Sequence, residues 1–282
     1  MADYLSDLSR KHWMVSNPKR LNRTGMDGKS FRCPFCPGNE EDTPPEVYRV
    51  GEGEANKSGW EVRVVPNLFP ITDIHEVVIH STSHDTNIEG LALPQLEKII
   101  RTYINRFNFH KHEGKVYIFS NQSLSSGASL IHSHSQISVL PQEIPTDTIS
   151  SQPVENIIEQ NNSFVSYCPT YSEWSYEVWI KALGQNKFES LNETEVKDLA
   201  AILHLMINKL KKIHGSSPRF SKKEFGYNFY VYPYDSWYLR IIPRFMERAG
   251  FELSTGIMVN SVTAEKASQE LRDITADLHP VL

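Results

Sequence analysis

The sequence contains the same order of predicted elements twice, and this repeat limits the folds that the chain can adopt. In each half a strand precedes a long amphipathic helix, and two more strands follow the helix. Matching segments lie about 101 residues apart, an offset that grows to about 108 at the last strand. Two copies of a strand–helix–strand–strand unit predict an α+β fold. The expected strands are 75–79, 115–121 and 130–140 in the first half, and 176–180, 227–233 and 237–245 in the second.

Each helix is predicted from apolar residues spaced three and four apart, which places them on one face. The first stripe comprises Leu96, Ile99, Ile100, Tyr103, Ile104 and Phe107. The second comprises Val196, Leu199, Leu203, Met206, Ile207, Leu210 and Ile213. Asn192 followed by Glu195 is typical of a capping box at the start of the second helix, and Gly215 is expected to end it.

A loop-rich segment between the halves, 141–163, provides the natural boundary. We therefore expect one unit over residues 1–145 and a second over residues 146–282. Comparison of the copies gives three correspondences: His84 with Gln185, His132 with Arg240, and His134 with Ile242. On this basis only the first unit keeps histidine chemistry. The second is expected to be scaffold or the wall of the substrate site.

Charge and hydropathy argue against several classes of protein. A formal charge of -5 over 282 residues argues against a general nucleic-acid or membrane-surface binder. No apolar run reaches the length of a membrane span, and the N-terminus lacks the apolar region of a signal peptide. Three cysteines, a small and odd number, are typical of reduced thiols. We expect a cytoplasmic protein with neither a nucleic-acid nor a membrane partner.

The segment around HSHSQ gathers polar side chains in a form suited to phosphate chemistry. Residues two apart in a strand share a face, so His132, His134 and Gln136 are expected to lie on one side. A turn of small residues precedes them. Its backbone N–H groups near Gly127 and the hydroxyl of Ser129 can bind phosphate oxygens.

A metal site is predicted around Cys33 and Cys36. They form a C-x-x-C knuckle rich in Pro and Gly, which can turn two thiolates toward one point. No thioredoxin-like context surrounds the pair, which disfavours a redox role. His84, just past a strand, and His132 are the best of the 11 histidines to complete a tetrahedral Zn²⁺ site. Four protein ligands leave no open position, so this zinc is expected to be structural.

The expected chemistry is nucleophilic attack by a histidine. The sequence has no G-x-S-x-G elbow, Walker loop or dinucleotide fingerprint. A neutral imidazole can attack phosphorus through one ring nitrogen, while the other donates to a backbone carbonyl and fixes the tautomer. Gln136 can donate to a non-bridging phosphate oxygen in the transition state. Arg20 and Arg23 offer forked donors for a diphosphate, although a solvated basic loop fits their spacing equally well.

These features together resemble the histidine-triad superfamily, in its nucleotidyltransferase branch. The resemblance is to the galactose-1-phosphate uridylyltransferases and their relatives, the ADP-glucose phosphorylases. Four segments carry it: RCPFCPGN (32–39), VRVVPNLFP (62–70), HEVVIHSTSH (75–84) and the run 121–136. The family fold is two fused histidine-triad units, each an antiparallel sheet packed with a long helix, which agrees with the repeat.

The resemblance implies roles for individual residues. His134 is similar to the nucleophile that forms a nucleotidyl-histidine, and Gln136 stands where transferases keep glutamine and hydrolases a third histidine. Asn67 matches a nucleoside-contacting asparagine. The positions that match phosphate contacts are Asn121, Ser129, Arg20 and Arg23, and those that match structural zinc ligands are Cys33, Cys36, His84 and His132.

The sequence also departs from the family pattern. Leu68 follows Asn67 where the uridylyl enzymes usually have an acidic residue, and HSHSQ replaces their HPHGQ. Both changes look more like the ADP-glucose phosphorylases. A second metal site of the family uses a W-x-L-H-x-H strand, whereas residues 237–242 read WYLRII, so that site is expected to be absent. The candidate sugar contact is the segment 250–256.

The expected activity is nucleotidyl transfer on a nucleoside diphosphate sugar, as in galactose and related carbohydrate metabolism. Sugar 1-phosphate is released or accepted, and phosphate or another sugar 1-phosphate is the second substrate. Two alternatives stay open: a dinucleoside polyphosphate phosphorylase, and a zinc-containing nucleotide-binding protein without catalysis. Family members often form dimers, so the resemblance also implies a homodimer.

Overall fold

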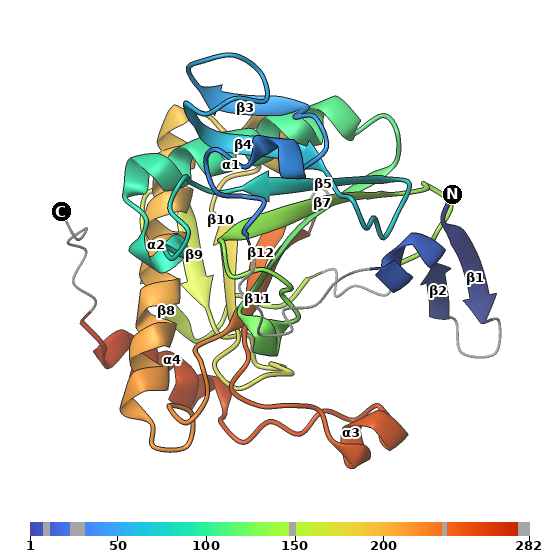
Figure 1. The fold of residues 1–282 in the computed structure, drawn as a ribbon. Helices are drawn as coiled ribbons and strands as arrows, with labels where there is room; N and C mark the ends of the chain where they lie inside the picture. Colours follow the sequence, from blue (N-terminus) through green and yellow to red (C-terminus); the bar gives the residue numbers. More distant parts are fainter. Residues whose placement is uncertain (8–11, 23–31, 147–150, 233–235, 276–282) are drawn as a thin grey trace.

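The structure is a computed structural model, and it describes residues 1–7, 12–22, 32–146, 151–232 and 236–275. Within these residues the centre is an antiparallel sheet of ten strands in the order β3-β4-β5-β7-β6-β11-β12-β10-β9-β8 (Figure 1). The strands are β3 (Tyr48–Gly51), β4 (Trp60–Pro66), β5 (Ile74–Ile79), β6 (Lys115–Gln122), β7 (His134–Leu140), β8 (Ile157–Gln160), β9 (Phe164–Tyr167), β10 (Val178–Ala182), β11 (Tyr227–Tyr232) and β12 (Tyr238–Pro243).

The two halves of the chain form the two halves of this sheet. Strands β3 to β7 belong to the first half and β8 to β12 to the second, and β6 pairs with β11 where the halves meet. With α1 (Leu93–His110) and α2 (Glu193–Ser216), the predicted repeat is confirmed as β5–α1–β6–β7 and β10–α2–β11–β12. The proposed unit boundary between residues 145 and 146 stays a prediction, because a hydrophobic core runs through both halves.

Both long helices pack on one face of the sheet and against each other. The predicted apolar stripes face this core, with only Ile104 partly exposed. The capping box at the start of α2 is confirmed: the Asn192 side chain accepts the N–H groups of Thr194 and Glu195, and the Glu195 carboxylate accepts the N–H of Asn192. The helix continues one residue beyond Gly215.

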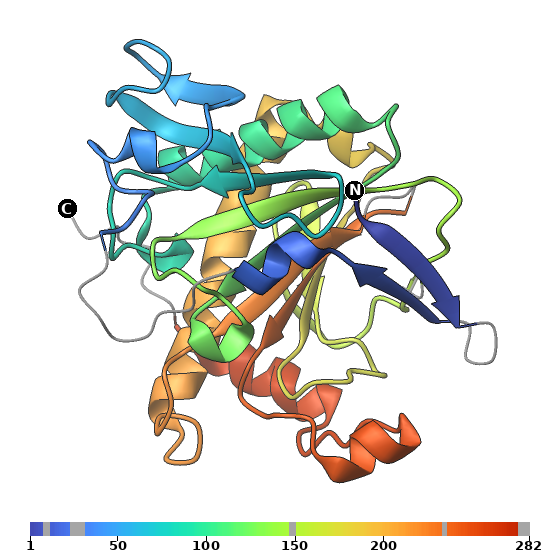
Figure 2. The same ribbon diagram turned by 45° about the vertical axis from the view of Figure 1, so that its right-hand side comes forward.

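The other face of the sheet carries the polar residues of the HSHSQ segment. Strand β7 begins at His134, so His134 and Gln136 share this face, while Ser135 and Ile137 point toward the helices. The expectation that His132 shares the strand face is wrong, because His132 precedes the strand. The hairpin of β1 (Asp3–Asp7) and β2 (His12–Ser16) extends from the side of the ten-stranded sheet (Figure 2). The short helix η1 (Pro18–Asn22), which follows β2, lies in front of that sheet in the same view.

Two shorter helices follow the sheet. Helix α4 (Ala264–Asp273) packs against α2 and β8, whereas α3 (Gly250–Thr255) projects from the body and none of its residues is buried (Figure 1). In the described part of the chain, every helix is too short or too polar to cross a membrane.

Candidate active site and metal centre

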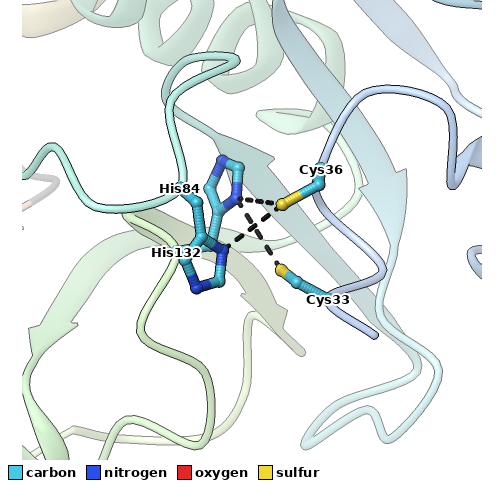
Figure 3. A group of neighbouring side chains, drawn as sticks. All are labelled: Cys33, Cys36, His84 and His132. Carbon is cyan, nitrogen blue, oxygen red and sulfur yellow. Dashed lines mark hydrogen bonds between the residues drawn. The ribbon is translucent and has the colours of Figure 1, made fainter. Parts of the chain in front are cut away.

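Four side chains from three segments meet at one point (Figure 3). Cys33 and Cys36 come from the knuckle, His84 from the loop after β5, and His132 from the segment before β7. Nδ1 of His84 lies 3.3 Å from Sγ of Cys36, and Nδ1 of His132 lies 3.7 Å from both sulfurs. Tetrahedral zinc, with bonds of about 2.3 Å to sulfur and about 2.0 Å to nitrogen, separates S and N by about 3.6 Å. Donor set and spacing therefore fit a tetrahedral metal ion.

Backbone hydrogen bonds shape the knuckle. The N–H of Cys36 donates to the carbonyl of Cys33, and the N–H of Asn39 donates to the carbonyl of Cys36. The side-chain amide of Asn39 also donates to the carbonyl of Cys33, at 2.7 Å. Gly38 reverses the chain with a φ of 86°, a left-handed conformation that glycine adopts without a steric penalty. The result is a tight loop that presents both thiols to one side.

The protonation of the cluster is compatible with a bound cation. Burial raises the pKa of the Cys33 thiol to about 11, so a thiolate there needs a positive counter-charge. Burial lowers the pKa of His132, which is therefore neutral near pH 7. Its Nε2–H donates to the carbonyl of Ser81 at 2.8 Å, and the lone pair on Nδ1 faces the sulfurs. The cluster can thus hold a metal ion.

His134 lies next to this cluster, at the start of β7. Its Nδ1–H donates to the carbonyl of His132 at 2.8 Å, so the neutral ring carries its lone pair on Nε2. Phe35 of the knuckle packs edge-on against the ring, with centroids 5.3 Å apart. Residues of the metal cluster and its knuckle therefore fix both the position and the tautomer of His134.

A pocket of about 500 Å³ opens beside His134. One group of lining residues is apolar and comprises Phe35, Val65, Leu68, Phe69, Val77 and Leu130. A second group is polar and includes the predicted site residues Arg20, Asn67, Ser129, His134 and Gln136. Apolar walls beside several hydrogen-bond donors suit a ligand that joins a flat base to a phosphate chain.

Two other predicted residues, Asn121 and Gly127, do not line this pocket. Asn121 on β6 accepts from Nδ2 of Asn228 across the central strand pair at 2.7 Å, and Gly127 ends the turn after β6 with a φ of 86°. Asn228 also donates to the carbonyl of Ser126 at 2.9 Å, so this amide pair supports the turn. Arg23 lies outside the described residues.

His75 was not among the residues predicted from the sequence, yet it lies beside the site. Its Nε2 is 3.0 Å from Oε1 of Gln136 and 3.3 Å from Nδ2 of Asn67. Its Nδ1 accepts the backbone N–H of Ile71 at 2.8 Å. The sequence signal was a histidine in the predicted strand HEVVI, and only the pairing of β5 with β7 brings it to Gln136.

The second half carries a different set of residues on the same face of the sheet. Arg240 on β12 is buried and donates to Glu177 at 2.8 Å, to Glu173 at 3.1 Å and to the hydroxyl of Tyr230 at 3.2 Å. Ile242 follows on the same face. Among the residues that the structure describes, the Cys33–Cys36–His84–His132 cluster is the one group with metal-binding spacing.

Comparison with known proteins gives two curated relatives that span nearly the whole chain. No protein-family model matches the sequence. The chain is 26% identical to the ADP-glucose phosphorylase of Arabidopsis thaliana, over 93% of its own length and 90% of the relative's. It is 22% identical to the galactose-1-phosphate uridylyltransferase of Thermotoga maritima, over 94% of its own length and 96% of the relative's.

Solved structures give the same result at the level of the fold. The crystal structure of an ADP-glucose phosphorylase from Arabidopsis thaliana with bound ADP-glucose matches with a TM-score of 0.76 at 25% identity, over 98% of this chain and 100% of that one. A uridylyltransferase structure matches in fold with a TM-score of 0.74 at 21% identity, over 96% of this chain and 98% of that one. The chain is thus a homologue of ADP-glucose phosphorylase and galactose-1-phosphate uridylyltransferase and has the fold of their branch of the histidine-triad superfamily.

Proposed function

We propose that this chain is a nucleotidyltransferase that acts on a nucleoside diphosphate sugar through a nucleotidyl-histidine at His134. The observation that carries the proposal is the Nδ1–H of His134, which donates to the carbonyl of His132 and leaves the lone pair on Nε2. The ring borders a pocket with amide and hydroxyl donors. Homology to two enzymes named as ADP-glucose phosphorylase and galactose-1-phosphate uridylyltransferase supports this activity.

The proposed reaction consists of two displacements. In the first, Nε2 of His134 attacks the α-phosphorus, the P–N bond forms, and the P–O bond to the sugar phosphate breaks. The sugar 1-phosphate leaves with the electron pair of that bond. In the second, an oxygen of inorganic phosphate or of another sugar 1-phosphate attacks the same phosphorus, and Nε2 recovers its lone pair as the P–N bond breaks. Such a double displacement gives ping-pong kinetics.

The side chains around His134 stabilise the charge that moves through the phosphoryl group. We assign the non-bridging oxygens to the amide of Gln136 and the hydroxyl of Ser129, since fixed donors need no reorganisation during the reaction. Arg20, whose Nη1 donates to the carbonyl of Phe69 at 3.1 Å, adds positive charge to the same pocket. Arg23 is assigned to the same diphosphate.

Asn67 is assigned to the nucleoside. Asn121 and Gly127 act in this proposal as supports of the turn before Ser129, because neither lines the pocket and because Asn228, which bonds to Asn121, also donates to the carbonyl of Ser126 in that turn.

We assign Zn²⁺ to Cys33, Cys36, His84 and His132, since two cysteines and two histidines form a typical structural zinc set. When bound, the ion neutralises the thiolates and ties the knuckle to the segment before β7. Two neighbours of the proposed ion contact His134: the ring of Phe35, which lies in the knuckle, and the backbone carbonyl of His132, which is one of the proposed ligands. The role of the metal centre is therefore to hold the protein around the nucleophile.

ADP-glucose is the first nucleotide sugar to test, with inorganic phosphate as the acceptor. The choice of ADP-glucose is supported by the relative with 26% identity, which is an ADP-glucose phosphorylase. Leu68 lines the pocket beside Asn67, so the nucleoside end has an apolar wall at this position in place of a carboxylate. UDP-glucose and UDP-galactose form the second arm of the test.

We also propose a cytoplasmic homodimer. Apolar side chains are 49–75% exposed on α3 and the segment after it, at Phe251, Leu253, Ile257 and Val259. Covering them with a second copy would remove this apolar surface from water. The cysteines are free thiols, and a thiolate metal site persists in a reducing compartment. Analytical ultracentrifugation tests the dimer, and a monomer at micromolar concentration would refute it.

Covalent labelling tests the proposed reaction. The protein is incubated with ADP-glucose radiolabelled at the α-phosphate, and then with the UDP-sugars and a dinucleoside tetraphosphate in parallel. We expect an acid-labile, base-stable label on His134 that inorganic phosphate removes as a nucleoside diphosphate. The variant His134→Ala should carry no label. The matched control His204→Asn, which changes a buried histidine on α2 outside the pocket, should label normally.

Three outcomes separate the proposal from its alternatives. A wild-type protein that never labels but binds the nucleotide tightly would make the chain a binding protein. If only the dinucleoside tetraphosphate labelled the protein, the chain would be a dinucleoside polyphosphate phosphorylase, whose leaving group is a nucleotide and not a sugar 1-phosphate. Full activity in His134→Ala would refute the histidine mechanism.

A further inference from the structure

The two ring nitrogens of His75 have partners that leave a single tautomer. The backbone N–H of Ile71 donates to Nδ1 at 2.8 Å. Because a backbone N–H can only donate, Nδ1 carries no proton, and the neutral ring is protonated at Nε2. The residue is only 4% exposed, so water does not compete freely for these contacts.

The proton on Nε2 in turn fixes the amide of Gln136. Nε2 of His75 lies 3.0 Å from Oε1 of Gln136, so the Nε2–H donates to that oxygen. A reversed amide would place its NH₂ group against the Nε2–H, with two donors facing each other. The carbonyl end of Gln136 is therefore held by His75. The NH₂ end is left to face a ligand in the pocket.

A second backbone group sets the amide of Asn67 in the same sense. The N–H of Phe69 donates to Oδ1 of Asn67 at 2.8 Å. Its Nδ2 lies 3.3 Å from Nε2 of His75, so Asn67 offers that nitrogen no acceptor, and Oε1 of Gln136 at 3.0 Å is the acceptor for the Nε2–H. With the N–H of Ile71 on Nδ1, this arrangement opposes the fewest donors, and it leaves the NH₂ group of Gln136 for an acceptor such as a phosphate oxygen.

We propose that His75 is a positioning residue for the transfer step, which holds the Gln136 amide with its NH₂ group toward the phosphoryl group on His134. This inference rests on the proposed function. The register supports it, because Val77 pairs with Gln136 and Ile79 with His134, which places His75 on the same face of the sheet. A second proton on Nδ1 would oppose the N–H of Ile71, so His75 serves as a fixed donor.

The tautomer can be measured without any reaction. Nitrogen NMR on protein labelled at the histidine ring nitrogens distinguishes a bare ring nitrogen from a protonated one. We expect His75, assigned by its loss in His75→Gln, to show a bare Nδ1 and a protonated Nε2. A protonated Nδ1 would overturn the inference.

Two substitutions separate positioning from mere packing. In His75→Asn the shorter amide can still accept the N–H of Ile71 but cannot reach Gln136, whereas the longer amide of His75→Gln can again donate to Gln136. We expect the single-turnover rate of histidine labelling to fall about 10- to 100-fold in His75→Asn, part of the roughly 10²–10³-fold effect of losing a whole donor. His75→Gln should recover most of the rate. The dissociation constant for the nucleotide sugar should change less than about threefold in both.

A double-mutant cycle identifies the residue through which His75 acts. In a Gln136→Ala background, His75→Asn should slow labelling by no more than about twofold, because the amide it positions is gone. Effects that multiply would overturn the inference, as would equal losses in His75→Asn and His75→Gln when thermal melts show both folded. A wild-type protein that never labels would refute the proposed function instead, while the NMR result would still stand.

Discussion

The orientation of the Gln136 amide predicts an order of activity for two variants that is the reverse of the order expected from side-chain shape. Gln136→Glu keeps the size of the side chain and its acceptor for the Nε2–H of His75, whereas Gln136→Ala removes both. If shape were decisive, the glutamate variant would be the more active. Because Oε1 is held by His75 and Gln136 lines the pocket, we infer that the NH₂ end faces the ligand, and we expect the glutamate variant to be the slower.

The magnitude follows from the charge placed at that position. Loss of one donor to the transferring group in Gln136→Ala lowers the rate about 10²–10³-fold. Gln136→Glu loses the same donor and adds a carboxylate oxygen next to an anionic phosphoryl group. Two like charges about 4 Å apart repel by about 4 kcal/mol at an effective dielectric constant of about 20. Since about 1.4 kcal/mol corresponds to tenfold, the glutamate variant should be slower than the alanine variant by roughly 10²–10³-fold.

The assay is single-turnover formation of the nucleotidyl-histidine with ADP-glucose labelled at the α-phosphate, followed by rapid quench. Thermal melts of both variants control for folding, and His204→Asn controls for the removal of a polar side chain outside the pocket. A glutamate variant as fast as the alanine variant, or faster, would refute the amide orientation and with it the charge argument.

Three further predictions concern the metal and the scaffold. Elemental analysis should find one zinc ion per chain in the wild type and less in Cys36→Ser, which should also melt at a lower temperature, whereas unchanged zinc content would refute the site. Burial lowers the pKa of His110, but the hydrogen bonds that its ring donates to the carboxylates of Glu76 and Glu113 raise it above its usual value. The stability it contributes is therefore present below about pH 6.5 and lost as the pH rises through the folded-state pKa. Urea titrations should accordingly show the difference in unfolding free energy between wild type and His110→Gln shrinking as the pH rises above about 6.5, and a constant difference would contradict this. Asn192→Ala removes the capping box of α2 and should lower the free energy of unfolding by about 1 kcal/mol in the same titrations, while no loss would mean that the cap is not stabilising.

The elements of the fold could be predicted because their signals are local. The apolar stripes of α1 and α2, the capping box at Asn192 and the alternation in β5 and β7 each depend on residues within a few positions of one another. The order of strands in the sheet has no such signal. Strand β7 lies between β5 and β6, and this order requires pairing between segments separated by the whole of α1.

The gathering of Cys33, Cys36, His84 and His132 into a group with metal-binding spacing was predictable for a different reason. A C-x-x-C knuckle needs two further ligands of a known type to form a tetrahedral site. Among the histidines, His84 follows a predicted strand and His132 begins the HSHSQ segment, which made them the best candidates. The direct phosphate contacts expected at Asn121 and Gly127 were harder to judge. The sequence places both near Ser129, but neither lines the pocket, and Asn121 is hydrogen-bonded to Asn228 from the other half of the chain.

The order of amino acids specifies which chemical groups this protein has: two thiols and two imidazoles with metal-binding spacing, and a histidine and a glutamine two residues apart on a strand. Where the protons of these groups lie depends on contacts that form only on folding. The carbonyl of His132 holds the proton on Nδ1 of His134, and the N–H of Ile71 holds the proton of His75 on Nε2. The physical reason is that an imidazole or an amide can turn either end toward a neighbour. Its direction is therefore fixed only by backbone groups that folding brings within hydrogen-bonding distance.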